Sequence, residues 1–247
     1  MSWVLDLDGV VWLADTPIPG AAEAVDKLRV EGRRVMFVTN NSSLTVGDYV
    51  AKLARMGIEV PAGDVVSSAL AAAGMVEPGS SALVVGGAGA VEALEQRGVD
   101  VRPEPPVDAV VVGFTREFDF DRLTLAARAV WAGARLIGTN PDATYPTPDG
   151  LLPGAGSLVA AVAYATGRQA ELAGKPHQPL VDLLHRLSPD IEIVVGDRID
   201  TDGELAARVG VPFGLVLSGV TRPGDPRMDA ADRVADDLLS LVDGYGH

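Results

Sequence analysis

The 247-residue sequence contains no cysteine and only three histidines, at positions 177, 185 and 247. The lack of cysteine excludes disulfides, thiolate metal sites and cysteine nucleophiles, and so few histidines argue against a histidine-built metal site. Basic residues are also scarce, since 20 Lys and Arg against 34 Asp and Glu give a formal charge of -14. This excess of negative charge argues against nucleic acid or an anionic membrane surface as a partner.

Long hydrophobic runs are absent as well. Nowhere do 18 consecutive apolar residues occur, so the sequence predicts no transmembrane helix. The first apolar run has no basic region before it and is interrupted by Asp6 and Asp8, which is unlike a signal peptide. We therefore expect a cytoplasmic protein. Because 47% of the residues are apolar, the chain can form one large globular domain or two modest ones.

Short β-branched runs alternate with amphipathic helical patterns along the whole chain, which is typical of a parallel α/β protein. After a first strand that ends near Asp6, the predicted strands are residues 34–38, about 64–68, 82–86, 109–114, 134–138, 191–195 and 213–217. The predicted helices are residues 21–31, about 46–57, 91–97, 120–132, a small-residue helix to about 166, 180–187 and 229–241. A turn is predicted at residues 147–150, and a domain boundary near residues 77–80.

The stretch that begins at Trp3 ends in Asp6-Leu7-Asp8-Gly9. Strand geometry places Asp6 and Asp8 on one face. A buried strand would not carry two carboxylates, so the strand should end here, where open α/β sheets bind ligands. Gly9 allows a sharp turn and a close approach of a ligand. Two adjacent like charges need a cation or a proton, although a turn with two solvated carboxylates is the simpler alternative.

Polar residues follow several other predicted strands or precede a helix. The full set is Asp6, Asp8, Thr39, Asn40, Lys175, Asp197 and Asp202. Neighbouring parallel strands end at the same edge of a sheet, so these groups can converge on one crevice. Carboxylates without histidine or cysteine suit Mg²⁺, and one lysine can attract phosphate oxygens. One aspartate can act as a nucleophile on a phosphate ester and the other as a general acid and base.

Each of these motifs also has an ordinary structural explanation. The run from Thr39 to Ser43 can be only a helix N-cap, because Ser, Thr and Asn dominate such caps. Lys175 alone is best explained as a solvated loop residue, and the acids near Asp197 as a surface turn. What favours a functional site is that the motifs fall in order on successive strand ends.

The motifs together resemble the haloacid dehalogenase-like hydrolases, in particular the NagD-like or 4-nitrophenylphosphatase branch. The matching segments, which occur in the family's order, are Asp6-Leu7-Asp8-Gly9-Val10, Val38-Thr39-Asn40-Asn41-Ser42, Gly174-Lys175-Pro176 and Gly196-Asp197-Arg198-Ile199-Asp200-Thr201-Asp202. The resemblance covers essentially the whole chain. It implies a doubly wound, Rossmann-like core at residues 1–78 and 172–247. A smaller inserted α/β domain, the cap, is implied at residues 79–171.

The resemblance also implies a role for each acidic motif residue. Asp6 would be the nucleophile, and Asp8 the general acid and base. Asp6, the backbone carbonyl of Asp8 and Asp197 would hold Mg²⁺. Gly9 would support the turn, and Asp202 the metal shell or the lysine.

The remaining motif residues are implied to bind phosphate. Thr39, Asn40 and Asn41 would contact the transferring phosphoryl group, and Lys175 would steady both the phosphate and Asp6. In the cap, Asn140 and Asp142 either face a substrate or simply shape a turn. Caps of this kind close over the site, and many relatives pair through them, so a homodimer is compatible with the resemblance.

We therefore expect a Mg²⁺-dependent phosphomonoester hydrolase that acts on a small phosphorylated metabolite through a phospho-aspartyl intermediate. Substrates consistent with the resemblance include 2-phosphoglycolate, which we prefer here, glycerol phosphate and p-nitrophenyl phosphate-like esters. The main alternative is a phosphate-metabolite-binding protein with weak or no catalysis on the same fold. A receiver-like regulatory domain would need only about half this length, and dehalogenation needs neither Mg²⁺ nor the second aspartate.

Overall fold

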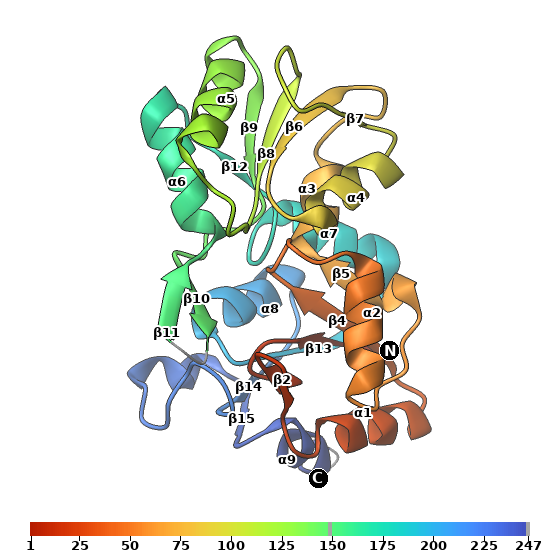
Figure 1. Cartoon of the computed structure of the whole chain (residues 1–247). Helices are drawn as coiled ribbons and strands as arrows, with labels where there is room; N and C mark the ends of the chain where they lie inside the picture. Colours follow the sequence, from red (N-terminus) through yellow and green to blue (C-terminus); the bar gives the residue numbers. More distant parts are fainter. Residues whose placement is uncertain (148–149, 246–247) are drawn as a thin grey trace. The chain divides into compact units, whose positions relative to one another are not determined.

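The computed structural model describes residues 1–147 and 150–245, so the turn predicted at residues 147–150 lies partly outside the described residues. The chain divides into two compact units, whose elements are labelled in Figure 1. Unit 1 comprises Met1–Thr39, Gly47–Val66 and Val181–His247, and unit 2 comprises Asn40–Val46 and Ser67–Leu180. The cap predicted at residues 79–171 lies within unit 2, and its own limits stay a prediction. Among the described residues, no helix is long and apolar enough to cross a membrane.

A six-stranded sheet in the order β15-β14-β13-β1-β4-β5 forms the centre of unit 1. Its strands are β1 (Ser2–Asp6), β4 (Arg34–Thr39), β5 (Val65–Ser67), β13 (Ile191–Gly196), β14 (Phe213–Val216) and β15 (Arg233–Ala235). From β1 the chain builds outward first through β4 and β5, then on the other side through β13, β14 and β15. This is the doubly wound order, in which a ligand crevice forms where the winding changes direction, between β1 and β13.

The continuous apolar run of β1 is explained by its place between β13 and β4, to both of which it pairs in parallel. All five residues of β1 are buried, and Trp3, Val4 and Leu5 have no exposed surface. A strand covered on both faces needs apolar side chains on both, which is why this strand does not alternate.

Helices and a short hairpin complete unit 1. They are β2 (Trp12–Leu13), β3 (Thr16–Pro17), α1 (Ala21–Val30), α2 (Val46–Arg55), η1 (Ala62–Asp64), η2 (Ile199–Gly203), α8 (Glu204–Val209), η3 (Pro226–Ala230) and α9 (Leu238–Asp243). Helix α7 (Gln178–Leu187) spans the division between the units. Helices α1 and α9 pack against each other, and α8 packs against β13. Gly32 and Gly57 follow α1 and α2 in left-handed conformations, as expected where a helix ends.

Unit 2 has its own parallel sheet, in the order β12-β9-β8-β6-β7. Its strands are β6 (Ser81–Val85), β7 (Asp100–Val101), β8 (Ala109–Val112), β9 (Arg135–Gly138) and β12 (Glu171–Leu172), beside a hairpin of β10 (Thr144–Thr147) and β11 (Gly150–Pro153). Its helices are α3 (Ser68–Gly74), α4 (Ala88–Gln96), α5 (Phe120–Trp131) and α6 (Ala155–Thr166). Helices α5 and α6 lie on one side of this sheet and α3 and α4 on the other (Figure 1). Both units are therefore α/β layers, as the sequence predicts.

The helix predicted at residues 229–241 is wrong. The segment forms the end of η3, the edge strand β15 and the short helix α9. Asp232 explains the difference, because its backbone N–H donates to the Phe213 carbonyl and its carboxylate accepts from the Phe213 N–H at 2.8 Å. This pairing aligns the next residues with β14. Asp237 then caps α9 by accepting from the N–H of Ser240 at 2.8 Å.

Candidate active site

The carboxyl ends of β1, β4 and β13 bring three predicted site residues to one edge of the unit 1 sheet. Asp6 is the last residue of β1 and aligns with Val38, so Thr39 ends the neighbouring strand one residue further on. Asp197 directly follows Gly196 at the end of β13, on the other side of β1. All three residues are buried: Asp6 is 7% exposed, Asp197 2% and Thr39 1%. This edge is the change-of-direction point of the sheet, where doubly wound folds bind ligands.

Asp6, Asp197 and Asp202 form a buried cluster of carboxylates in unit 1. Each offers one oxygen, and these oxygens all lie within 4.8 Å of one another. Buried like charges repel, and a cation between them offsets that repulsion. Two oxygens on opposite sides of Mg²⁺ lie about 4.2 Å apart, so the observed spread is close to what the ion needs. An all-oxygen set of this size therefore fits Mg²⁺ and is poorly suited to zinc.

Three glycines leave room for these carboxylates. A Cβ on Gly9 or on Gly219 would overlap the Asp197 side chain, and a Cβ on Gly196 would overlap that of Asp202. Gly9 has in addition a left-handed conformation with φ of 86°. The physical reason for a glycine here is that the Asp197 carboxylate packs directly against the Gly9 backbone. The supporting role predicted for Gly9 stays a prediction.

Backbone N–H groups hold the second acidic motif in place. Val220 donates from its backbone N–H to Asp197 Oδ2 at 2.6 Å, and Thr221 donates to the Asp197 carbonyl at 3.1 Å. The hydroxyl of Ser218 donates to the Gly9 carbonyl at 2.7 Å. Asp202 Oδ2 accepts from the N–H of Arg198 at 3.1 Å. The loop after β14 thus connects the turn after β1 to the turn after β13.

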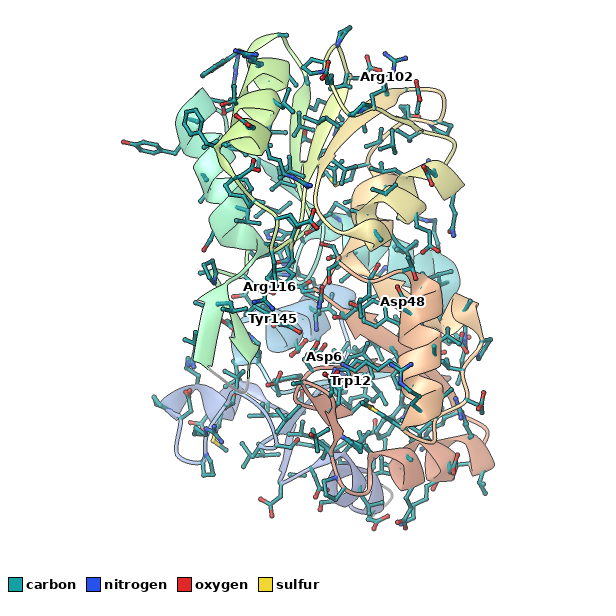
Figure 2. The ribbon with its side chains drawn as sticks, in the orientation of Figure 1. Asp6, Trp12, Asp48, Arg102, Arg116 and Tyr145 are labelled. Carbon is teal, nitrogen blue, oxygen red and sulfur yellow. The ribbon has the colours of Figure 1, made fainter. Side chains whose placement is uncertain are left out.

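Asp8 lies in the turn beyond β1. Because β1 ends at Asp6, the expectation that strand geometry places both aspartates on one face does not apply. The Asp8 side chain instead accepts a hydrogen bond from Nε1 of Trp12 at 3.1 Å. Figure 2 shows Trp12 together with Asp6 in this part of unit 1. The predicted part of Asp8 in metal binding, through its carbonyl, stays a prediction.

In unit 2 the predicted residues Lys175, Asn140 and Asp142 all bond to Asn40, Lys175 and Asp142 through its side chain and Asn140 through its backbone carbonyl. Asn40 Oδ1 accepts from the Lys175 N–H at 2.8 Å, and its Nδ2 donates to the Lys175 carbonyl at 3.2 Å and to Asp142 Oδ2 at 3.1 Å. A Cβ on Gly174 would overlap Asn40 Oδ1. Lys175 is 3% exposed, whereas solvated loop lysines are exposed. The solvated-loop explanation of Lys175 is therefore wrong.

Asn140 and Asn41 both bond to nearby protein groups. Asn140 donates to the Asn40 carbonyl at 2.6 Å, and its Oδ1 accepts from the Asp142 N–H at 3.0 Å. Asn41 Oδ1 accepts from the N–H of Ser43 at 3.0 Å and from the Ser43 hydroxyl at 2.7 Å. These bonds favour the turn-shaping explanation of Asn140 and give Asn41 a similar structural part. The substrate and phosphate contacts predicted for these two residues stay predictions.

The sequence alone predicts no part in the site for Trp12 or for the loop from Ser218 to Thr221. The loop could have been noticed by the criterion used for the other motifs, because polar and glycine residues follow β14 directly. Trp12 carried no comparable signal, since a tryptophan near a strand end is usually core.

Comparisons with known proteins agree with this geometry. A model of haloacid dehalogenase-like hydrolases matches residues 3–100, and a HAD-hydrolase-like model matches residues 172–241. The glycerol-3-phosphate phosphatase of Homo sapiens is 37% identical over an alignment 257 residues long, gaps included. The alignment covers 90% of this chain and 80% of that protein. The D-glycerol 3-phosphate phosphatase of Mycobacterium tuberculosis is 40% identical over 233 residues, 90% of this chain and 64% of that protein.

Solved structures extend the likeness to the whole fold. The p-nitrophenyl phosphatase from Archaeoglobus fulgidus superposes with a TM-score of 0.91 at 30% identity, covering 98% of each chain. A glycerol phosphate phosphatase from Mycobacterium tuberculosis, solved in complex with magnesium, gives 0.88 at 35% identity, covering 97% of this chain and 75% of that one. The chain belongs to the haloacid dehalogenase-like hydrolase family, and the resemblance to its NagD-like, nitrophenylphosphatase branch is confirmed.

Proposed function

We propose that this chain is a Mg²⁺-dependent phosphomonoester hydrolase that works through a phospho-aspartyl intermediate. The observation that carries the proposal is the buried oxygen cluster of Asp6, Asp197 and Asp202 at the change-of-direction point of a doubly wound sheet. Asp6, Asp197 and the Asp8 carbonyl, with Asp202 in support, would hold Mg²⁺, and the ion would supply the positive charge that lets an anionic nucleophile approach an anionic phosphate.

The chain's own residues then perform two transfers. An Asp6 oxygen attacks phosphorus, the bond from phosphorus to the ester oxygen breaks, and the Asp8 carboxyl gives its proton to the leaving oxygen. In the second transfer the Asp8 carboxylate takes a proton from water, the water oxygen attacks the phosphorus of the acyl phosphate, and the bond from phosphorus to the Asp6 oxygen breaks. Inorganic phosphate leaves, and both aspartates return to their first state. Thr39, Asn40, Asn41 and Lys175 are proposed to bind phosphoryl oxygens.

The substrate we propose is a small phosphorylated metabolite. Glycerol phosphate is proposed in place of 2-phosphoglycolate, because two relatives, 37% and 40% identical to this chain, are named as glycerol 3-phosphate phosphatases. Acid sugar phosphatases are also among the relatives, at 36% identity. We also propose that this metabolic enzyme is located in the cytoplasm.

The test is phosphate release from a panel of phosphomonoesters, with and without Mg²⁺. The variant Asp6→Asn should lose turnover by at least about a thousandfold, because it removes the nucleophile. The matched variant Asp121→Asn, at an exposed position in the first turn of α5, should behave as wild type. Metal-dependent release that survives Asp6→Asn would overturn the mechanism. No release from any ester would favour the alternative of a phosphate-metabolite-binding protein.

A homodimer through the cap also stays a proposal, supported by exposed large apolar side chains on α5 and α6. Phe120 and Trp131 are 11 residues apart in α5 and therefore share a face of that helix, with 79% and 64% of their surfaces exposed. Tyr164 of α6, a helix that packs against α5, is 93% exposed. Large apolar side chains exposed together often mark interaction surfaces. Sedimentation of wild type and Trp131→Glu tests this, since a dimer through this face should dissociate in the variant.

A further inference from the structure

The general acid and base of the proposed reaction is held by a tryptophan. Trp12 is 1% exposed, and its Nε1 donates to Asp8 Oδ1 at 3.1 Å. The same turn is closed by backbone bonds, from the Gly9 N–H to the Trp12 carbonyl at 2.7 Å and from the Trp12 N–H to the Leu7 carbonyl at 3.2 Å. Trp12 therefore fixes both the path of the turn and the direction of the Asp8 carboxylate.

Lys52 of α2 in turn holds Trp12. Its Nζ lies 4.3 Å from the centroid of the Trp12 ring, and its side chain is only 14% exposed. The same Nζ donates to the Ala14 carbonyl at 2.6 Å and lies 3.3 Å from a carboxylate oxygen of Asp15. Ala14 has a φ of 53°, a strained value for a residue that is not glycine. The Lys52 ammonium group thus contacts three residues of the hairpin that begins at Trp12, namely Trp12, Ala14 and Asp15.

We propose that Trp12 and Lys52 are positioning residues that orient Asp8 for proton transfer to the leaving oxygen, an inference that rests on the proposed function. A cation over an aromatic face is attracted by the ring and withdraws electron density from it, which makes the indole N–H a stronger donor. A bond from a rigid, buried ring to one carboxylate oxygen fixes the rotation of Asp8. Proton transfer depends steeply on such alignment.

The chain provides a matched control for Trp12. Trp3 is also fully buried, and its Nε1 also donates to a carboxylate, Glu192 Oε2, at 3.1 Å. It lies near the start of β1, whereas Asp6 and Asp8 lie at the end of β1 and beyond it. Trp12→Phe and Trp3→Phe therefore remove the same group from the same kind of environment. Lys27 provides the control for Lys52, because it is also a paired lysine of unit 1. Its partners, Glu23 and Asp243, lie away from this turn.

The first experiment measures kcat/KM with Mg²⁺ for glycerol 3-phosphate, an alkyl ester, and for p-nitrophenyl phosphate, whose leaving group departs without a proton. Trp12→Phe should lower the alkyl value by about tenfold to a hundredfold and the aryl value by less than about threefold. Lys52→Met should lower the alkyl value by about threefold to tenfold. Trp3→Phe and Lys27→Met should leave the ratio of the two values as in wild type.

The second experiment does not depend on activity. Because the chain has three tryptophans, its indole N–H groups give three NMR signals; Trp3→Phe and Trp131→Phe assign two of them, and the third belongs to Trp12. The Trp12 proton should resonate downfield of the Trp131 proton, whose side chain is 64% exposed. It should move upfield in Asp8→Ala and in Lys52→Met, while the Trp3 signal stays in place. These measurements remain possible if Trp12→Phe does not fold.

Two results would overturn the inference. One is an active wild-type enzyme in which Trp12→Phe changes the alkyl and aryl values equally, or no more than Trp3→Phe does. The other is a Trp12 indole signal that does not respond to Asp8→Ala. Failure of the proposed function looks different, because then wild type itself releases no phosphate or Asp6→Asn stays active.

Discussion

The sharpest test of the metal site is the addition of one methyl group at Gly219. The backbone φ of Gly219 lies outside the left-handed range, so alanine introduces no conformational strain there. Its Cβ would however overlap Oδ2, Cγ and Cβ of Asp197. The Asp197 carboxylate must then move, and with it the 2.6 Å hydrogen bond from the N–H of Val220 is stretched or lost.

The size of the effect can be estimated in two ways. Loss of a group that orients a metal ligand typically lowers affinity by about tenfold to a hundredfold. At about 1.4 kcal/mol for each factor of ten, this range corresponds to about 1.4–2.8 kcal/mol. A hydrogen bond to a charged group contributes about 1.5–3 kcal/mol, which agrees. We therefore expect Gly219→Ala to weaken Mg²⁺ binding by about tenfold to a hundredfold.

Isothermal titration of the ligand-free protein with Mg²⁺ measures this directly, with no substrate present. Gly63→Ala is the matched control, because Gly63 is exposed, lies in η1 and has nothing within 4 Å of an added Cβ. It should bind Mg²⁺ as wild type does. A folded Gly219→Ala protein with wild-type Mg²⁺ affinity would refute the assignment of Asp197 as a ligand supported by this loop.

Three further predictions concern stability and pH. Leu5→Ala in β1, whose side chain has no exposed surface, should lower the free energy of unfolding by about 2–5 kcal/mol in urea titrations. The hydrogen bond from Arg135 lowers the pKa of Glu171 below its ordinary 4.5, so the stability this pair adds is present above that value and lost as the pH falls through the lower folded pKa. Because both side chains are nearly half exposed, Glu171→Gln should reduce the unfolding free energy at neutral pH by less than about 1 kcal/mol and flatten its decline in acid. Asp237→Ala should cost about 1 kcal/mol by removing the cap on α9, measured by thermal unfolding.

The sequence sufficed for the central strands of the unit 1 sheet and for the polar residues at their ends, because burial determines both. The apolar run of β1 requires cover on both faces, and the change to aspartate marks where that cover stops. The same logic located Thr39 at the end of β4 and Asp197 after β13. Thr39 is the last residue of its strand and Asp197 follows its strand directly, because a polar or charged group is costly inside a buried strand without a partner.

The C-terminal segment could not be predicted in the same way. The stretch from Asp229 to Leu241 carries a helical pattern of apolar residues, but an exposed edge of β14 competes for the same backbone. Sheet pairing gives Arg233–Ala235 backbone partners that no local pattern reveals. Asp237 offered a local sign of the true boundary, because aspartate before an apolar pair is a favoured helix start. Tertiary pairing therefore outweighed local propensity here.

The residues that support the site are less visible in sequence than those that form it, for a physical reason. A side chain that binds the ion must offer a carboxylate oxygen here, so its residue type restricts its role. A support can be a backbone N–H, as at Val220, or bare space, as at Gly219, and neither restricts residue type in a recognisable way. Trp12 lies between these two cases. Its residue type already accounts for its burial, so the sequence gives no sign that its Nε1–H bonds to Asp8. Such supporting groups are recognised in the folded structure because they act through the direction of a hydrogen bond or the distance to a neighbour. Residue type alone does not encode either.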